Sequence, residues 1–227
     1  EDKAITGSVA DNDSSSSGGL LDYALKDGPS HGTVVVDADG TYIYSPTANF
    51  NGIDSFTYMV TDAASGESLT RVVSLSVTAV NDAPIASGTA VLGPIVEDTL
   101  TPASASVMTL FGGTHFSDSA DAVAGGSVTD SFAGIAISAY TADAAKGNWQ
   151  YSTNGGITWV ALGNATTSVA ITLNASDLLR FVPAANYNGA APALSANLIE
   201  SGATALVSGD TVDLSTPGAT GGSTRYS

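Results

Sequence analysis

YSPTANFNGIDSFTYMV, which spans residues 44–60, contains the end of one expected strand, a turn and the next strand. Pro46 has no N–H to donate to a sheet, so pairing is expected to stop there. The dipeptide Asn51–Gly52 favours a tight turn, because glycine tolerates a positive φ. After the turn, apolar side chains at every second position share one face, which is typical of a half-buried strand: Phe56, Tyr58 and Val60. The stretch therefore predicts β-structure.

The first half of this stretch occurs twice, because FVPAANYNG at residues 181–189 repeats the pattern of YSPTANFNG at residues 44–52. The aromatic residues Phe50 and Tyr187 are expected to fill the same corner of the core in each copy. With one extra residue in the second copy, the alignment continues and places Asp62 opposite Glu200, each at the end of a strand. Repetition of this kind indicates tandem modules.

Similar alternating runs, separated by turn residues, indicate further strands at residues 20–25, 32–36, 41–45, 71–80, 132–140 and 168–173. The DADG segment at Asp37–Gly40 is interpreted as a hairpin turn, because it lacks the downstream glutamate of an EF-hand loop. NDAP at Asn81–Pro84 ends the last strand of the first module. The sequence therefore predicts an all-β chain of two tandem Greek-key β-sandwich modules, residues 1–83 and 84–227. One large all-β domain is the alternative for 227 residues.

The charge of the chain is strongly unbalanced. Asp and Glu total 22 against 6 Lys and Arg, so the formal net charge is −16 and the pI is about 4.1. Such a surface repels polyphosphates and anionic lipids, and we therefore exclude nucleic acid and membrane surfaces as partners. It attracts Ca²⁺, which prefers carboxylate and carbonyl oxygens. The absence of cysteine excludes disulfides, thiolate zinc sites and cysteine nucleophiles.

Several ordered motifs make residues 1–84 closely similar to the cadherin-like tandem repeats of large bacterial surface adhesins of the RTX type: EDKAITGSVADND, DGPSHGTV, DADGTYIYSPTANFNGIDSFTYMVTD and VSLSVTAVNDAP. The second module resembles an Ig-like repeat found beside that type, through LFGGTHFSD, WQYSTNGGITW and LRFVPAANYNG. The resemblance implies type I secretion, an extracellular stalk on the bacterial cell surface and calcium at the module junctions. It also implies one more strand after residue 227, so the second module is expected to lack its closing strand.

The resemblance further implies the calcium ligands. Asn81 and Asp82 match the family's junction pair, and Glu97 with Asp98 match the acidic pair that opens the next module. Asp118 and Asp121 are the candidates for the ligand loop, at a D-x-x-D spacing that departs from the family's D-x-D. The corresponding set in the first module comprises Glu1, Asp2, Asp11, Asp13 and Asp62.

Carboxylate clusters of this kind have a physical reason to bind calcium. Several carboxylates within a few ångströms repel one another, and a cation that takes about 6–8 oxygen ligands removes the repulsion. We expect Ca²⁺ to order the hinge between modules, with affinities of roughly 10⁻⁴ to 10⁻³ M, as is common for extracellular modules. The alternative is that these Asp and Asn residues only form turns and Asx caps.

YSTNGGITW at residues 151–159 fits the Asp-box pattern S-x-D-x-G-x-T-W, with Asn154 in place of the aspartate. That motif resembles a hairpin whose polar residues brace their own turn while the tryptophan packs inward. The functional alternative is a platform for sugar rings, although Trp and Tyr at alternate positions are more often core or cross-strand pairs. The platform would consist of Trp149, Tyr151 and Trp159. His31 and His115 lie in no recognisable catalytic motif, and we expect no enzyme.

We therefore expect non-catalytic, calcium-binding stalk modules of a bacterial cell-surface adhesin that acts in cell adhesion and biofilm formation. The modules are expected to be monomeric, to contact neighbouring repeats of the same chain and to be rigidified by Ca²⁺ at their junctions. The alternative is a module that binds a surface glycan or host ligand through the Trp/Tyr hairpin. A third hypothesis is an accessory domain of a secreted hydrolase, whose catalytic residues would lie outside this sequence.

Overall fold

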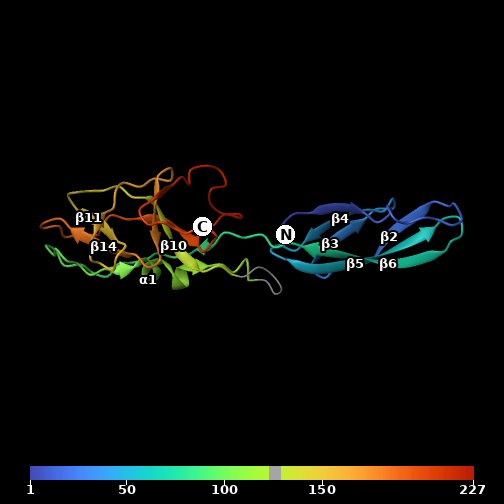
Figure 1. The fold of residues 1–227 in the computed structure, drawn as a ribbon, viewed down its shortest axis with the longest axis horizontal. Coiled ribbons are helices and arrows are strands. Elements are labelled where there is room, and N and C mark those ends of the chain that lie inside the picture. Colours follow the sequence, from blue (N-terminus) through green and yellow to red (C-terminus); the bar gives the residue numbers. More distant parts are fainter. Residues whose placement is uncertain (123–128) are drawn as a thin grey trace. The chain divides into compact units, whose positions relative to one another are not determined.

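The computed structural model describes residues 1–122 and 129–227, which form two compact units (Figure 1). The first unit contains Glu1–Val80, and the second contains Asn81–Asp121 and Thr129–Ser227. Nearly all regular structure in both units consists of β-strands. The prediction of an all-β chain with Ig-like sandwich architecture is confirmed.

The first unit has two three-stranded antiparallel sheets, with the strand orders β1-β4-β3 and β2-β5-β6. The strands are β1 (Ile5–Ser8), β2 (Leu21–Asp27), β3 (Gly32–Val36), β4 (Thr41–Pro46), β5 (Gly52–Asp62) and β6 (Ser68–Val77). As predicted, Pro46 ends β4 and Gly52 begins β5. The predicted hairpin turn at Asp37–Gly40 is also confirmed, since Gly40 has a φ of 87° and its N–H donates to the Asp37 carbonyl at 2.9 Å.

The core of the first unit lies between these sheets, and β5 contributes most to it. Its side chains alternate between the core and solvent, so Phe56, Tyr58 and Val60 are buried. Phe56 is only 1% exposed and packs edge-on against Tyr42, with ring centroids 5.3 Å apart. The period-two pattern thus places these residues on the inner face, as the sequence predicts.

Asp54, also on the inner face of β5, is a buried carboxylate that joins the two sheets. It is 4% exposed and accepts hydrogen bonds from the Ser30 and His31 amides at 3.0 Å each and from the Tyr44 hydroxyl at 2.9 Å. Burial raises the pKa of Asp54, but the hydrogen bonds it accepts outweigh burial and leave that pKa lowered. Burial and the same carboxylate raise the pKa of Tyr44 to about 12.

We expect Asp54→Asn to destabilise the first unit by about 2 kcal/mol at neutral pH, because buried donors lose a charged acceptor. Since the folded-state pKa of Asp54 lies below the ordinary value of 3.8 for an aspartate, this stabilisation is present above pH 3.8 and is lost as the pH falls through the folded-state pKa. Urea unfolding of both proteins near pH 7 and near pH 3 measures the difference. The exposed Asp22→Asn is the control, and equal stability of wild type and Asp54→Asn near pH 7 would contradict the prediction.

The second unit contains two four-stranded antiparallel sheets, β15-β10-β13-β16 and β12-β11-β14-β8, and a short pair β7-β9. Its N-terminal elements are β7 (Ile85–Ala86), β8 (Ala105–Ser106), the helix α1 (Val107–Phe111), the 3-10 turn Gly113–His115 and β9 (Phe116–Ser117). The remaining strands are β10 (Phe132–Ala139), β11 (Gly147–Ser152), β12 (Val160–Ala161), β13 (Ala170–Asn174), β14 (Leu178–Pro183), β15 (Ser195–Glu200) and β16 (Thr211–Val212). The short α1 is an addition to the predicted strands, and the Ser106 hydroxyl caps it by accepting from the Thr109 amide at 3.0 Å.

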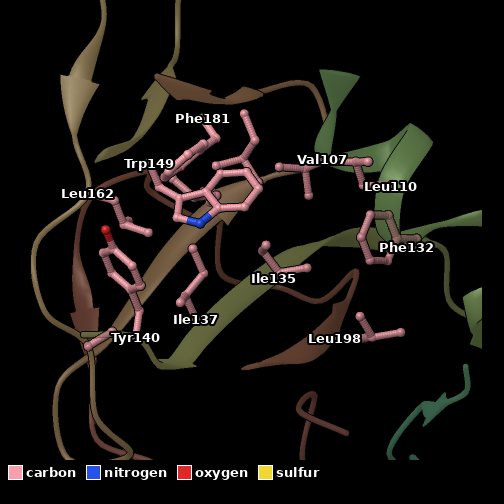
Figure 2. Close-up of a cluster of buried hydrophobic side chains, with 13 residues drawn as sticks. Val107, Leu110, Phe132, Ile135, Ile137, Tyr140, Trp149, Leu162, Phe181 and Leu198 are labelled. Carbon is pink, nitrogen blue, oxygen red and sulfur yellow. The ribbon is translucent and has the colours of Figure 1, made fainter. Parts of the chain in front are cut away.

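The main core of the second unit lies between its two large sheets (Figure 2). β10 supplies Ile135 and Ile137, and the facing sheet supplies Trp149 and Phe181. Val107 of α1 is fully buried in the same cluster. The strand predicted at residues 132–140 is therefore central and buried on both faces over much of its length.

The turn of the repeated nine-residue pattern makes the same hydrogen bond to an aspartate in both units. The Asn49 amide donates to Asp2 Oδ1 at 2.9 Å, and the Asn186 amide donates to Asp98 Oδ1 at 2.7 Å. All four of these residues have positive φ values, between 57° and 61°. Asp62 ends β5 and Glu200 ends β15, as the alignment of the two copies predicts.

Candidate metal centre in the second unit

Strand ends of the second unit bring three aspartates together. Asp118 directly follows β9, Asp121 lies three residues further on, and Asp130 lies two residues before β10. One carboxylate oxygen from each of the three lies within 4.8 Å of the others. Glu200 pairs with Phe132 at the start of β10, so its carboxylate belongs to the same end of the sheet. We call these four residues the carboxylate cluster.

The carboxylate cluster is buried to an unusual degree for acidic groups. Asp118 is 7% exposed, Asp121 is 2% exposed and Glu200 is 0% exposed. Backbone and side-chain donors hold the carboxylates in place: the Asp130 amide donates to Asp118, and the Ser201 hydroxyl donates to Asp130. Burial of this kind is costly unless each charge is compensated.

The Asn81–Asp82 segment reaches the same cluster. Asn81 Nδ2 donates to Glu200 Oε1 at 2.6 Å, and the Asp82 amide donates to Asp121 Oδ1 at 3.2 Å. The Ala83 amide donates to the Gly222 carbonyl at 2.6 Å. These contacts explain why the junction segment packs as part of the second unit, although the expected boundary lay after residue 83.

Two buried carboxylate oxygens of the cluster have no hydrogen-bond partner among the described residues: Asp118 Oδ1 and Glu200 Oε2. Burial raises the pKa of Glu200 to about 7, and the charges of Asp118, Asp130 and Asp121 add to this rise against the opposing hydrogen bond from Asn81. The pKa of Asp118 is also raised, first by burial and then by its acidic neighbours. The site therefore disfavours the charge that four carboxylates bring to it.

No basic side chain compensates this charge within the described ranges. The two ion pairs found there join His31 with Asp54 and Lys146 with Asp143, and neither involves the cluster. The hydrogen bonds of the Arg225 guanidinium go to backbone carbonyls, those of Glu200 and Thr204, at 2.8 Å each, and not to a carboxylate of the cluster. Three buried carboxylates and the half-buried Asp130, with the unpartnered oxygens Asp118 Oδ1 and Glu200 Oε2, fit the donor set of a hard divalent cation.

Sequence reasoning identified part of this site. The structure brings together four of the residues expected to bind metal, namely Asn81, Asp82, Asp118 and Asp121. It adds Asp130 and Glu200, which were not among the candidates. The alignment of Glu200 with Asp62 at a strand end was a signal for Glu200, whereas no motif or spacing marks Asp130.

Glu97 and Asp98 lie outside the carboxylate cluster. Both are exposed, and Asp98 accepts the Asn186 amide in the turn of the repeated pattern. Asp2 accepts the Asn49 amide in the same way in the first unit, so the two acidic pairs occupy corresponding positions in the two units and brace the same turn.

The acidic residues expected to act together in the first unit are spread along its length. Glu1 Oε1 accepts the Val80 amide at 2.7 Å, and its Oε2 accepts from Asn51 beside the start of β5. Asp62 is the last residue of that 11-residue strand, about 34 Å away along its axis. The structure therefore does not gather this set at one place.

The other acidic residues of the first-unit set have local partners or are exposed. Asp62 accepts the Ser15 and Ser17 hydroxyls at 2.5 and 2.6 Å, and these bonds lower its pKa to about 2. Asp13 accepts the Tyr58 hydroxyl at 3.3 Å, and Asp11 is exposed. Serine hydroxyls hold Asp62 in the place that Glu200 occupies in the second unit.

The hairpin at residues 151–159 braces its own turn, as predicted. Asn154 Oδ1 accepts from the Ser152 hydroxyl and from the Thr158 amide at 2.9 Å each, and the Gly156 amide donates to Ser152 Oγ at 2.9 Å. Trp159 differs from the expectation because it is half-exposed. Its indole N–H donates to the Gly156 carbonyl, and the Arg180 guanidinium lies 3.9 Å from its ring centroid.

The three aromatic rings do not form one exposed platform. Trp149 is 8% exposed and packs against Phe181 in the core, where its indole N–H donates to the Pro192 carbonyl at 2.8 Å. Tyr151 is half-buried at the edge of the same core. Since Trp149 is in the core, the hairpin lacks the stacking surface that a sugar ring would need.

The fold defines the class of an all-β protein with Ig-like sandwich architecture. Residues 1–76 match the model of the family described as bacterial Ig domain. The first unit is thus similar in sequence to bacterial Ig domains over residues 1–76. No curated protein and no solved structure matches the chain significantly. Within the described residues, no helix is long and apolar enough to cross a membrane.

Proposed function

We propose that these units are non-catalytic, extracellular extender modules of a bacterial surface adhesin, and that Ca²⁺ stabilises the second unit. Exported by type I secretion, such modules would hold a distal binding domain away from the cell in adhesion and biofilm formation. The match of residues 1–76 to a bacterial Ig domain supports the extender role. The two unpartnered, buried oxygens of Asp118 and Glu200 carry the calcium part of the proposal.

The carboxylates of Asp118, Asp121, Asp130 and Glu200 would hold the ion, with the Asn81–Asp82 segment at its side. Bound calcium would supply positive charge and oxygen coordination, and thereby remove the mutual repulsion of the carboxylates. A carboxylate-rich site suits Ca²⁺ better than Mg²⁺, which retains its water ligands and demands a near-ideal octahedron. The residues come from four separate segments of the second unit, so ion binding would tie these segments together.

We expect millimolar Ca²⁺ to raise the stability of the second unit relative to EDTA, and Mg²⁺ to do so much less. At about 10 mM Ca²⁺ and a Kd near 10⁻⁴ M, mass action gives about 2–3 kcal/mol. Both tryptophans, Trp149 and Trp159, lie in the second unit, so thermal unfolding followed by tryptophan fluorescence reports on this unit alone.

Asp118→Asn tests the site, because it keeps the shape of the side chain and removes one ligand charge. We expect this variant to lose most of the Ca²⁺-dependent rise, whereas Asp210→Asn at an exposed position of the same unit retains it. Identical fluorescence melts in EDTA, Ca²⁺ and Mg²⁺ would refute the calcium site. An equal rise in both variants would assign the effect to general charge screening.

A further inference from the structure

Arg180 carries a positive charge that no carboxylate of the chain meets. The other Lys and Arg side chains of the second unit have partners, since Lys146 pairs with an aspartate and Arg225 donates to backbone carbonyls. Among the described residues, the guanidinium of Arg180 donates hydrogen bonds only to the neutral amide of Gln150. Residues 123–128 contain no acidic side chain, so every Asp and Glu of this strongly acidic chain belongs to the described ranges.

The sheet holds Arg180 at a fixed place. Arg180 lies on β14, an interior strand of the sheet β12-β11-β14-β8. Its neighbours Leu179 and Phe181 are buried in the core, so Arg180 projects from the outer face of the sheet. Gln150 of β11 is its direct cross-strand partner and lies on the same face. Regular strands on both sides of β14 therefore position this cation.

Two contacts fix the plane of the guanidinium. Nε and Nη2 both donate to Gln150 Oε1, at 2.9 and 2.7 Å, and the guanidinium carbon lies 3.9 Å from the centroid of the Trp159 ring. Trp159 is held in turn, because its indole N–H donates to the Gly156 carbonyl at 3.0 Å. Both N–H groups of Nη1 and one of Nη2 are left over. Together, Nη1 and Nη2 form the fork that binds both oxygens of a carboxylate.

An uncompensated guanidinium is costly at this place. Arg180 is half-buried, and this burial lowers its pKa. Removal of water from an ion raises its free energy unless an opposite charge takes the place of the water. The stack on Trp159 offsets part of this cost. An anion at the free fork would offset the rest.

The surrounding surface restricts the kind of anion. The chain has a net charge of −16, which repels polyanions, so a suitable ligand carries a single carboxylate on a neutral body. Amide side chains flank the fork: Gln150, whose Nε2 has no hydrogen-bond partner within the described ranges, and the exposed Asn148, two positions away on the same face of β11. Amides both donate and accept hydrogen bonds, which suits the hydroxyl groups of a sugar.

We propose that Arg180 anchors a saccharide whose terminal ring bears one carboxylate, a uronic acid, on the outer face of this sheet. The carboxylate accepts from Nη1 and Nη2 of Arg180, and ring hydroxyl groups bond to Gln150 and Asn148. Trp159 orients the guanidinium and is a positioning residue. The anchor is ionic, so it does not depend on a platform of three aromatic rings, which the structure excludes. This binding role is additional to the extender role and needs no metal ion.

The test compares two probes that differ at one carbon: methyl β-glucuronide carries a carboxylate where methyl β-glucoside carries a hydroxymethyl group. Each is titrated into the full chain in EDTA, and heteronuclear NMR follows the Arg180 Nε–H and the Trp159 indole N–H. The glucuronide should shift both signals to saturation, and the glucoside should bind about tenfold more weakly. Arg180→Gln should weaken glucuronide binding about tenfold, whereas Lys146→Gln, which removes the same charge elsewhere in the unit, should leave it unchanged.

Equal binding of the two probes by the wild type, or no binding of the glucuronide, would overturn the proposal, and neither result depends on how well Arg180→Gln folds. Acetate that binds as tightly as the glucuronide would assign the fork to small anions in general. Tighter binding of N-acetylglutamate amide would assign it to an acidic peptide, and either result would equally overturn the saccharide. Because the titrations contain no Ca²⁺, this proposal and the calcium site can fail separately.

Discussion

We expect Glu200→Gln to stabilise the metal-free second unit near pH 8 and to destabilise the Ca²⁺-loaded one. The substitution keeps the size of the buried side chain and the oxygen that accepts the Asn81 amide. It removes a negative charge that three nearby aspartates repel. In the presence of Ca²⁺, the same change removes a charged ligand. One substitution thus has opposite signs in the two conditions.

The pKa of Glu200 sets the size and the pH range of the metal-free effect. Burial, reinforced by the neighbouring aspartates, raises this pKa from 4.5 to about 7 in the folded protein. The folded state therefore binds the proton more tightly than the unfolded state. The corresponding stability is fully present below pH 4.5 and is lost as the pH rises through 7. The loss amounts to about 3 kcal/mol above pH 7.

Urea unfolding in EDTA, followed by tryptophan fluorescence between about pH 4.5 and pH 8.5, measures this dependence. The wild-type second unit should lose stability across the range, and Glu200→Gln should show a clearly shallower decline. Asp210→Asn, at an exposed site in the same unit, should behave as wild type does. If Glu200→Gln were less stable than wild type in EDTA near pH 8, the electrostatic account of the cluster would be wrong.

The second large effect concerns the core of the first unit. We expect Phe56→Ala to destabilise this unit by about 3–5 kcal/mol, because the ring is 1% exposed and its loss leaves a cavity beside Tyr42. The stability of a unit of this size is itself on the order of 5–10 kcal/mol. The variant should therefore unfold at a much lower temperature in its first unit.

Two optical signals separate the units in this experiment. Far-ultraviolet circular dichroism follows both units, whereas tryptophan fluorescence follows the second unit only, because both tryptophans lie there. Phe56→Ala should move a circular dichroism transition and leave the fluorescence transition in place. Phe56→Leu, which fills more of the cavity, should cost less than half as much. A matching shift of the fluorescence transition would contradict independent unfolding of the two cores.

Local pattern was sufficient to predict most of the fold. In β5, alternation placed Phe56, Tyr58 and Val60 on the inner face, and Pro46 and Gly52 marked the adjacent strand boundaries, because these signals depend on neighbouring residues alone. The short α1 was not predicted, since five residues are too few for a helical period. Its hydroxyl cap at Ser106 becomes clear only from the structure.

The candidate site was less predictable because it depends on contacts distant in sequence. Asn81 meets Glu200 across 119 residues, and Ser201 meets Asp130 across 71. Family resemblance supplied Asp82, Asp118 and Asp121, but no spacing connects Asp130 to them. The Glu97–Asp98 pair shows the opposite case, in which a family motif predicts ligands that lie outside the cluster. The pair does correspond to Glu1–Asp2, but Asp2 and Asp98 each accept a backbone amide in the turn of the repeated pattern.

The bonds from Asp2 to Asn49 and from Asp98 to Asn186 bear on the order in which the chain folds. They span 47 and 88 residues, and Glu1 contacts Val80 across 79. Contacts of such long range close late and give slow folding, because much chain entropy is lost before they form. A chain that emerges end first from a ribosome or a pore would keep each unit open until nearly all of it had appeared. Transit and folding would then be separate stages in the life of the molecule.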